Sequence, residues 1–358
     1  MQTQRKELNY EGQNIFVGLD VHLKSWNTSI YTDSLHHKTF SGPPKPEALL
    51  EYLNCNFPNG NYFSAYEAGF CGLWAHYKLE ALGIHNIVIN PADVPTTQKE
   101  QMHKSDPVDS KKIGRSLRAN ELKGIYIPQV ETLEDRSLIR VRSTIVKDMT
   151  RIKQRIKSML YFYGIEFPKE FENGNSHWSK RFIKWLKTIQ LQHSTGTDSL
   201  QLWIKEAERQ REILLEATKK IKDLSTSERY FKNIELIRSV PGIGLITGMI
   251  LLVEIEDIAR FENSDKLAGF IGLIPTCHSS GERENKGEIT PRRHNSMRKT
   301  MIESSWIAAR RDPALSLSFS KYCKRMEPNK AITRIARKLV NRIFFVLITQ
   351  QKYESKIV

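Results

Sequence analysis

Short apolar runs separated by polar turns open the chain. The run at 15–19 ends in Asp20, and a second run at 26–31 follows after the polar turn HLKS. Two apolar runs joined by a short polar turn predict a β-hairpin. Phe40 is expected to close a third strand beside this hairpin.

Helical and strand patterns then alternate. Residues 46–54 and 72–82 have helical spacing, and residues 62–66 and 86–90 are short apolar runs typical of strands. Strands that alternate with helices predict an α/β domain, which we place at residues 1–128.

A longer helical pattern begins after the polar segment 92–105. Asp106 followed by proline is typical of a helix start, because aspartate caps the first turn and proline fits the first helical position. Further on, apolar side chains recur at alternating steps of three and four residues, the pattern of a coiled-coil seam. They are Leu138, Val141, Ile145, Met149, Ile152, Ile156 and Met159, then Trp203, Ala207, Leu214, Ala217, Ile221 and Leu224. We therefore expect a helical coiled-coil arm at 129–230, with two core helices of a bundle as the alternative.

The last region, residues 231–358, is expected to be mostly helical. Helical spacing at 234–240 and 245–255 flanks the turn PGIG, which contains Gly242 and Gly244. This pattern is typical of a helix–hairpin–helix, in which backbone N–H groups of the turn bind a DNA phosphate. An ordinary tight helical hairpin has the same pattern, and the four residues of the turn do not separate the two.

The charge of the chain narrows the class of partner. Lys and Arg number 55 and Asp and Glu number 40 among 358 residues, a formal net charge of +15. A surplus of this size indicates a polyanionic partner such as nucleic acid. The polar N-terminus and the absence of an apolar stretch of roughly 20 residues predict a soluble, cytoplasmic protein.

Four carboxylates form the first candidate site. Asp20 and Glu67 end two of the expected strands, and Asp106 and Asp109 lie one turn apart on one helix face. Strand ends of an α/β sheet are where ligands usually bind, and four hard oxygen donors can hold two divalent cations for phosphodiester cleavage. Each acid also has a plain structural explanation, as a turn or helix cap, an ion-pair partner or a complement to the helix dipole.

Two histidines, His22 and His103, lie close to these acids in the sequence. Either could approach a metal, although a single histidine is more commonly a surface or packing residue.

A second candidate site is Ser279-Ser280-Gly281 in a basic segment. A serine nucleophile in phosphoryl transfer needs cations that hold the phosphate and stabilise its transition state. The cations close by in sequence are Arg283, Lys286, Arg292, Arg293, Arg298 and Lys299. By spacing alone, a phosphate-binding loop or a solvated turn explains the segment better, because Ser-Ser-Gly is a common sequence.

Taken together, four motifs resemble one family. They are VGLDVHLKSW, YEAG, KSDPVDSKKIGRSLRANEL and the region SVPGIGLITGMILLVEIEDIARF through LAGFIGLIP, HSSG and GEIT. In this order they are similar to the DEDD transposases of the one-ten family of insertion sequences (the IS116 and IS902 type), which include the Piv-type invertases. The resemblance covers roughly residues 15–310.

The resemblance implies a RuvC-like, RNase H-type first domain, a coiled-coil arm and a C-terminal transposase domain. It implies that Asp20, Glu67, Asp106 and Asp109 bind Mg²⁺ or Mn²⁺. It also implies a serine nucleophile that forms a phosphoserine link to DNA, here Ser280 with Ser279 as the fallback. Similar enzymes are homo-oligomers, and some are guided by a structured RNA from their own element.

The sequence departs from the family pattern after the serine segment. Where the family often has ISKRGN, this chain has ITPRRHN, so that Pro291 replaces Lys and His294 replaces Gly. The expected function is a transposase or site-specific recombinase that acts on DNA. The alternatives are a metal-only RuvC-like nuclease, such as a junction resolvase, and a nucleic-acid-binding protein with an inactive nuclease fold.

Overall fold

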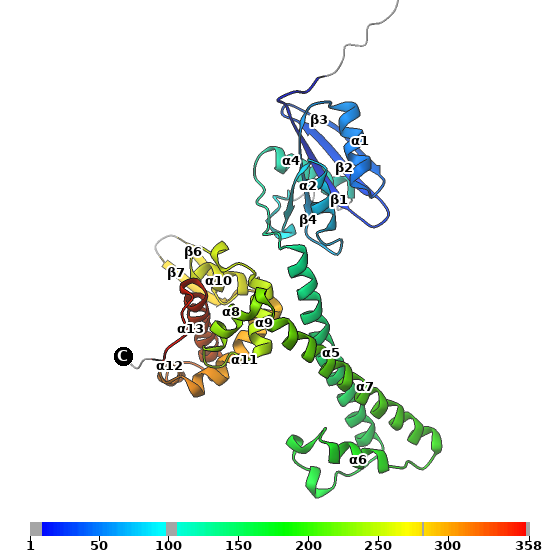
Figure 1. Ribbon diagram of the computed structural model, residues 1–358, viewed down its shortest axis with the longest axis vertical. Coiled ribbons are helices and arrows are strands. Elements are labelled where there is room, and N and C mark those ends of the chain that lie inside the picture. Colours follow the sequence, from blue (N-terminus) through cyan, green and yellow to red (C-terminus); the bar gives the residue numbers. More distant parts are fainter. Residues whose placement is uncertain (1–8, 98–105, 281–282, 356–358) are drawn as a thin grey trace, which may run out of the picture. The chain divides into compact units, whose positions relative to one another are not determined.

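The computed structural model describes residues 9–97, 106–280 and 283–355, and the side chains of residues 277–286 lie outside this description. The chain divides into two compact units, residues 1–127 and 128–358, and each is considered by itself. The first is mixed α/β and the second is mostly helical, as the sequence predicts (Figure 1). Nowhere in the described part of the chain is a helix long and apolar enough to cross a membrane.

The first unit is built around a five-stranded sheet. Its strands are β1 (Asn14–Val21), β2 (Trp26–Thr32), β3 (His36–Gly42), β4 (Asn61–Glu67) and β5 (His85–Ile89), in the order β3-β2-β1-β4-β5. The first three strands pair antiparallel, which confirms the predicted hairpin and third strand. β1 pairs parallel with β4, and β4 pairs parallel with β5.

Helices cover both faces of this sheet. α1 (Pro46–Asn56) and α2 (Trp74–Ala81) pack on the face that carries Ile15, Val17 and Leu19. α4 (Asp106–Arg118) packs on the other face, where Ile113 joins Ala65 of β4 in a smaller core. A short 3-10 turn, η1 (Pro91–Asp93), follows β5.

Two long helices open the second unit. α5 (Val130–Phe162) and α7 (Ser194–Ser225) pack antiparallel, because Ile156 shares a core with Leu200 whereas Ile139 shares one with Ile221. The predicted seam is only partly right: Ile145, Ile152 and Ile156 are buried, but Val141 is 52% exposed. Ile139, which was not part of the predicted seam, packs in the core instead. A straight α-helix drifts relative to a strict seven-residue repeat, so one set of heptad positions does not stay buried along the whole helix.

The connection between the two long helices contains short helices of its own, although its sequence is rich in turn residues. It contains η2 (Lys169–Phe171), η3 (Gly174–Ser176) and α6 (Lys180–Thr188). Phe182 and Leu186 of α6 are fully buried against the ends of α5 and α7. These two buried side chains lie four residues apart, on one face of α6. In a helix this short, so few apolar positions give only a weak sequence signal of an amphipathic helix.

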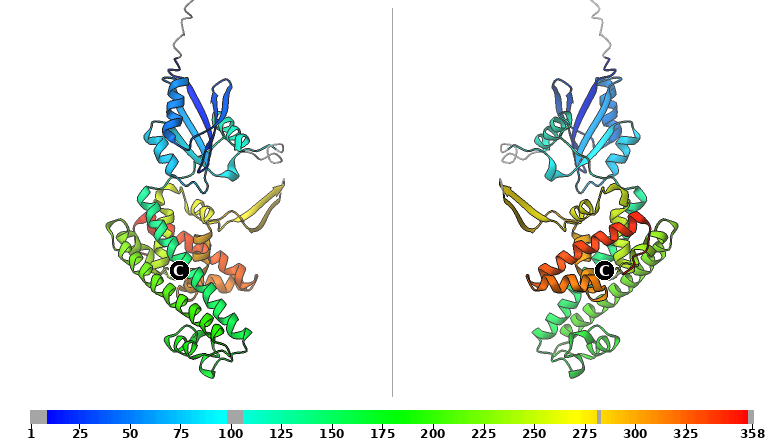
Figure 2. Two further views of the ribbon diagram at one scale, coloured as in Figure 1. Left: turned by 90° about the vertical axis from the view of Figure 1, so that its right-hand side faces the viewer. Right: turned by 90° about the vertical axis from the view of Figure 1, so that its left-hand side faces the viewer.

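The remainder of the second unit is a helical bundle with one hairpin. Its helices are α8 (Glu228–Arg238), α9 (Leu245–Ile255), η4 (Ile258–Arg260), α10 (Ser264–Ile271), α11 (Asn295–Arg311), α12 (Pro313–Cys323) and α13 (Pro328–Thr349). β6 (Pro275–Ser280) and β7 (Arg283–Ile289) form an antiparallel hairpin (Figure 2). The apolar α9 is buried in the middle of the core, and every residue from Gly248 to Ile255 is buried.

Candidate functional site

Asp20 and Glu67 lie at the ends of two neighbouring parallel strands. The register pairs Leu19 of β1 with Tyr66 of β4, so the next residue of each strand is one of the two acids. Side chains alternate along a strand, and Leu19 and Tyr66 both belong to the core under α1 and α2. Asp20 and Glu67 therefore point to the opposite face, where α4 packs.

Two glycines let α4 lie directly on this face. A Cβ on Gly18 would stand 2.1 Å from the carbonyl oxygen of Ser110, and one on Gly114 would stand 2.7 Å from the ring of Tyr31. The Ser29 and Ser110 hydroxyls also hydrogen bond at 2.9 Å in the buried interface. This close approach fixes the first turn of α4 at the strand ends that carry the acids.

The four predicted acids are consequently brought together from three elements. In one half of the cluster, His22 Nε2 lies 3.1 Å from Asp20 Oδ2 and 3.9 Å from Asp106 Oδ2. One ligand atom from each of these three residues falls within a 4.8 Å group that can hold a metal ion. His103, the other histidine considered, lies outside the described residues.

Lys112 occupies the other half of the cluster. Its Nζ lies 3.3 Å from Glu67 Oε1 and donates a 3.2 Å hydrogen bond to Asp109 Oδ1. The Lys112 side chain is only 9% exposed. Glu67 Oε1 is itself buried, and its ion pair with Lys112 Nζ supplies positive charge at this oxygen.

The electrostatics of the cluster favour a bound cation. Burial raises the pKa of Asp20, His22 opposes this shift, and the charges of Asp106 and Asp109 add to it. Burial by itself would lower the pKa of Lys112, but Asp109 and Glu67 outweigh it and raise that pKa. Carboxylate oxygens crowded together are the donor set that a divalent cation fits.

Sequence reasoning did not single out Lys112. The signal was present, because a residue three positions after Asp109 returns to the same side of the helix. A lysine in that position is more often solvent-exposed, and only the close packing of α4 on the sheet buries it.

The predicted serine nucleophile lies in the hairpin of the second unit. Ser280 is the last residue of β6 and pairs with Arg283, the first of β7. Its side chain and those of Ser279, Arg283 and Lys286 lie outside the described residues. The hairpin itself was not predicted, because the polar, basic sequence has no apolar alternation.

The remaining predicted cations differ in their surroundings. The Arg298 guanidinium is buried and donates to the carbonyl oxygens of Gly272 and Thr290, so it holds the loop after the hairpin onto α11. Arg293 donates to Asn295 Oδ1, and the backbone N–H of Arg292 donates to Thr290 Oγ1. Lys299 is 74% exposed, with Glu303 at 3.7 Å. Of these four, Arg298 is the one whose guanidinium is taken up by the interior of the fold.

The two glycines of the PGIG turn also differ. Gly242 has a φ of +91°, and a Cβ there would stand 2.5 Å from the carbonyl oxygen of Ser304 in α11. Gly244 precedes α9 with an ordinary φ of −87°, and a Cβ there would meet no heavy atom within 4 Å. Packing therefore explains Gly242, whereas it leaves Gly244 unexplained.

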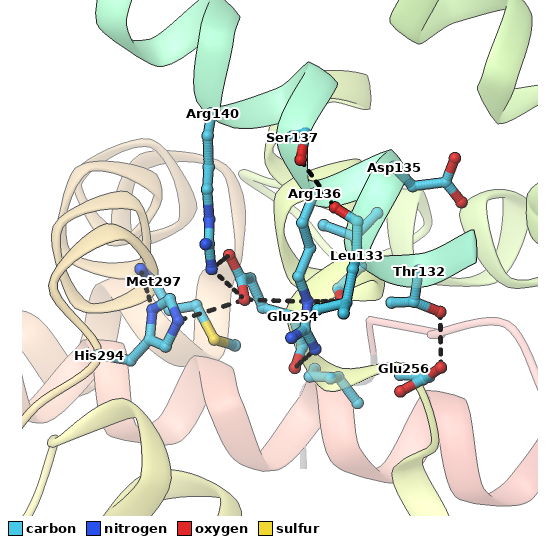
Figure 3. Close-up of polar contacts among 12 residues, drawn as sticks. Thr132, Leu133, Asp135, Arg136, Ser137, Arg140, Glu254, Glu256, His294 and Met297 are labelled. Carbon is cyan, nitrogen blue, oxygen red and sulfur yellow. Dashed lines mark hydrogen bonds and ion pairs between the residues drawn. The ribbon is translucent and has the colours of Figure 1, made fainter. Parts of the chain in front are cut away.

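A network of ion pairs joins α5, α9 and the start of α11 within the second unit (Figure 3). The Glu254 side chain on α9 is 6% exposed and contacts Arg136 at 3.2 Å, Arg140 at 3.1 Å and His294 at 3.3 Å. Burial would raise the pKa of Glu254, but His294, Arg140 and Arg136 outweigh it and lower that pKa to about 2. His294 Nδ1 accepts from the N–H of Met297 and caps α11, so its Nε2 is the atom that faces Glu254.

Comparisons with known proteins place both units among transposases. A family model described as Transposase IS116/IS110/IS902 family matches residues 234–320, and a DEDD transposase model of the IS110 group matches residues 17–165. The first match includes Ser280, and the second includes all four acids.

Three relatives share about a quarter of their aligned residues with this chain, and each of them is described as a transposase. The chain is 25% identical to the putative transposase y4qE of Sinorhizobium fredii, over 68% of this chain and 58% of that protein. It is 26% identical to the putative transposase y4rJ of the same organism, over 78% of this chain and 76% of that protein. It is 24% identical to the transposase for insertion sequence element IS1111A of Coxiella burnetii, over 79% of this chain and 77% of that protein.

Proposed function

We propose, because this chain belongs to the IS116/IS110/IS902 family of transposases, that it cuts and rejoins DNA at the ends of a mobile element. The reaction would use two sets of side chains, the acidic cluster of the first unit and the Ser280 hydroxyl of the second. In this proposal the first unit is a RuvC-like, RNase H-type domain.

The observation that carries the proposal is the convergence of four carboxylates from β1, β4 and α4. Asp20 contacts His22, which also approaches Asp106, and Lys112 joins Glu67 to Asp109. A group of like charges costs folding free energy, so a site that collects them is typical of a metal-dependent centre.

A divalent metal is what the DEDD type of transposase implies, and we propose Mg²⁺ or Mn²⁺. Asp20, Glu67, Asp106 and Asp109 would hold it. When bound, such a cation supplies positive charge that stabilises the phosphate and the leaving oxygen in phosphodiester cleavage.

The covalent step is assigned to Ser280. Its Oγ would form a bond to the scissile phosphorus while the bond from phosphorus to a deoxyribose oxygen breaks. The serine hydroxyl gives up its proton, and the leaving deoxyribose oxygen takes up a proton as a free hydroxyl. Attack by another deoxyribose hydroxyl on the phosphoserine would reverse the step, rejoin DNA and return the serine.

The nucleic-acid contacts are part of the same proposal. Exposed Lys299 and the backbone N–H of Gly244 would contact DNA phosphates in this proposal. Arg283, Lys286, Arg292 and Arg293 would contact them as well. Gly242 and Arg298 would support these contacts from inside the fold. The coiled-coil nature of the arm and its end at residue 230 remain predictions of the apolar pattern, and a homo-oligomer and a guide RNA remain predictions of the family resemblance.

Covalent trapping tests the proposal. The purified protein is incubated with labelled element-end DNA, RNA transcribed from the flank of the gene and Mg²⁺, then denatured and examined for protein-linked DNA. We expect an adduct in the natural protein and in Ser279→Ala. We expect none in Ser280→Ala or Asp20→Asn.

Two other results would change the assignment. Cleaved DNA without any adduct, retained in Ser280→Ala, would replace the serine mechanism with a metal-only nuclease. DNA binding that survives every substitution, with no cleavage under any metal, would indicate an inactive nucleic-acid-binding protein.

A further inference from the structure

The two last helices carry a concentrated positive charge. Between residues 313 and 349 there are eight Lys and Arg residues and a single acid, Glu327. That is a surplus of seven, close to half of the net charge of +15 for the whole chain. Most of this segment follows residue 320, where the family match ends.

Part of this charge forms a stripe along α13. The helix buries Ala331, Ile335 and Leu339 against the core. The exposed positions between them include Lys330, Arg334 and Lys338, which follow one another at intervals of four residues. Side chains at this spacing lie above one another on one helix face.

The stripe continues onto α12, which packs beside α13 (Figure 2). The Arg334 guanidinium lies 5.5 Å and Lys338 Nζ 5.8 Å from the centre of the Tyr322 ring. Lys338 Nζ also donates a 3.0 Å hydrogen bond to Ser318 Oγ on α12. Exposed Lys321, Lys324 and Arg325 surround Tyr322 in the sequence. We call these six cations, Lys321, Lys324, Arg325, Lys330, Arg334 and Lys338, the α12–α13 basic surface.

The cations of this surface lack acidic partners, whereas two other arginines of α13 have them. Within the described residues, no carboxylate lies within 4 Å of any of the six cations, whereas Arg337 and Arg342 of the same helix pair with Asp265 and Asp312 at 2.6 Å. Like charges four residues apart on a helix repel one another and weaken it. A polyanion bound along the stripe would relieve this repulsion.

The exposed side chains of the surface favour a duplex over unpaired strands, and the proposed function makes that duplex DNA. Proteins that bind unpaired bases offer exposed aromatic rings on which the bases stack. Tyr322, the ring that Arg334 and Lys338 face, is only partly exposed. Phe345 of α13 is 54% exposed, but it lies seven residues beyond Lys338, outside the run of the six cations. What remains accessible is a row of flexible cationic side chains, which match phosphates and read no bases.

We propose that the α12–α13 basic surface binds the phosphate backbone of duplex DNA without regard to its sequence. This inference rests on the proposed function, because it assigns to the last two helices the task of holding DNA for the transposase. It adds a contact region outside the segments that the family models match.

Salt-dependent binding tests the proposal. A fluorescein-labelled 30-base-pair DNA duplex of mixed sequence is titrated with the full chain in EDTA at several NaCl concentrations, and anisotropy gives the binding constant. The test variant carries Lys330→Gln, Arg334→Gln and Lys338→Gln. We expect its slope of log K against log salt to be shallower by about 3, since each lost phosphate contact removes roughly one unit.

The matched control removes the same charge elsewhere. It carries Arg151→Gln, Lys220→Gln and Lys266→Gln, three exposed cations that already have acidic partners on their own helices or beside them. We expect the control to keep the natural slope. A second variant, Lys330→Arg, Arg334→Lys and Lys338→Arg, preserves the charge and should also keep it.

Two outcomes would overturn the proposal. Equal slopes in the test and control triples would mean that only the overall charge of the chain matters. The same titration is repeated with an RNA duplex and with a single DNA strand, and a loss confined to either of these would assign the surface to another partner. Because binding is measured in EDTA, it does not depend on cleavage, so a negative trapping experiment would challenge the proposed function and leave this result standing. Thermal unfolding of each variant checks that the fold is retained.

Discussion

At the scale of single residues, Lys112 supplies a positive charge inside the acidic cluster. The four acids were predicted as a set of metal ligands, but Lys112 Nζ already lies within 3.3 Å of Glu67 and Asp109. The ammonium group neutralises this half of the cluster, whereas the half formed by Asp20 and Asp106 has only His22 beside it. A divalent cation must therefore compete with Lys112 if it is to use Glu67 and Asp109.

Removing the Lys112 ammonium should strengthen metal binding. We expect Lys112→Met to bind Mn²⁺ roughly tenfold more tightly than the natural protein, because a unit charge between two ligands is lost. Electron paramagnetic resonance of free Mn²⁺ during a titration measures this. Lys111→Met removes the same charge from the exposed neighbouring position and should leave the affinity nearly unchanged. Equal effects of the two substitutions would contradict the role given to Lys112.

The two glycines of the PGIG turn should respond differently to alanine. Gly242→Ala places a Cβ against the Ser304 carbonyl oxygen at a φ of +91°, so we expect it to lower the free energy of unfolding by about 2 kcal/mol or more. Gly244→Ala meets no neighbour and should change it by less than about 0.5 kcal/mol. Urea denaturation measures both.

A DNA-binding measurement then distinguishes the two interpretations of the turn at Gly244, a helix–hairpin–helix and an ordinary helical hairpin. If a phosphate approaches its backbone, the added methyl group of Gly244→Ala should weaken binding to duplex DNA while the fold stays stable. Unchanged binding would leave the turn as an ordinary helical hairpin.

At the scale of elements, packing decides where the predicted helices and strands lie. The apolar patterns predicted most elements of the first unit, including the strands that end in Asp20 and Glu67. The position of α4 depends on Gly18 and Gly114, whose missing side chains allow the helix to touch the sheet. The spacing of apolar residues does not indicate such a contact. The helix and the strand approach closely here because each has a glycine, without a side chain, at the point of contact.

The Glu254 network shows how three elements are fixed to one another within the second unit. α5 contributes Arg136 and Arg140, α9 contributes Glu254, and His294 caps the start of α11. His294 is a departure from the family pattern, and here it has a structural partner. The network was missed because Arg136 and Arg140 lie more than a hundred residues before Glu254 in the chain, and charged side chains carry no local signal of such a contact.

Substitution of Glu254 should destabilise the second unit. Glu254→Gln removes the charge that compensates the nearly buried Arg136, and we expect a loss of about 3 kcal/mol in the free energy of unfolding. Glu303→Gln, at an exposed ion pair, should cost less than about 1 kcal/mol. Urea denaturation followed by tryptophan fluorescence compares them, and similar losses would contradict a special role for the buried network.

The same network predicts a dependence on pH. The pKa of Glu254 is lowered from 4.5 to about 2 in the folded chain, so its stabilisation is complete above about pH 4.5 and is lost as the pH falls toward 2. Glu254→Gln should remove this part of the acid sensitivity, and an unchanged pH profile in the variant would contradict it.

At the scale of the whole molecule, the two units have separate cores. The first unit packs α1, α2 and α4 on its sheet, and the second packs its helices around α9. A chain with separate cores is not expected to unfold in one cooperative step. The acidic cluster belongs to the first unit, and the Glu254 network belongs to the second.

Calorimetry of the full chain should therefore show two transitions. We expect Glu254→Gln to shift only one of them to lower temperature. In EDTA, Asp20→Asn should shift the other to higher temperature, because it removes a partly buried charge from a repelling group. A single transition that both substitutions move together would contradict independent unfolding.

The sequence by itself determined the local structure and the chemical class of this protein. Apolar spacing predicted the strands of the first unit and the long helices of the second, and the charge surplus pointed to nucleic acid. The order of the motifs carried the resemblance to transposases, including the four acids and the serine segment. These features are local in the chain, so each can be recognised without knowing what packs against it.

Only the tertiary structure decided which side chains meet. It placed Asp106 and Asp109 beside the strand ends, inserted Lys112 between two of the acids, and took Arg298 into the interior. It also brought Arg334 and Lys338 of α13 against Tyr322 of α12. The physical reason is that contacts between distant segments depend on close packing and burial, which no run of neighbouring residues records.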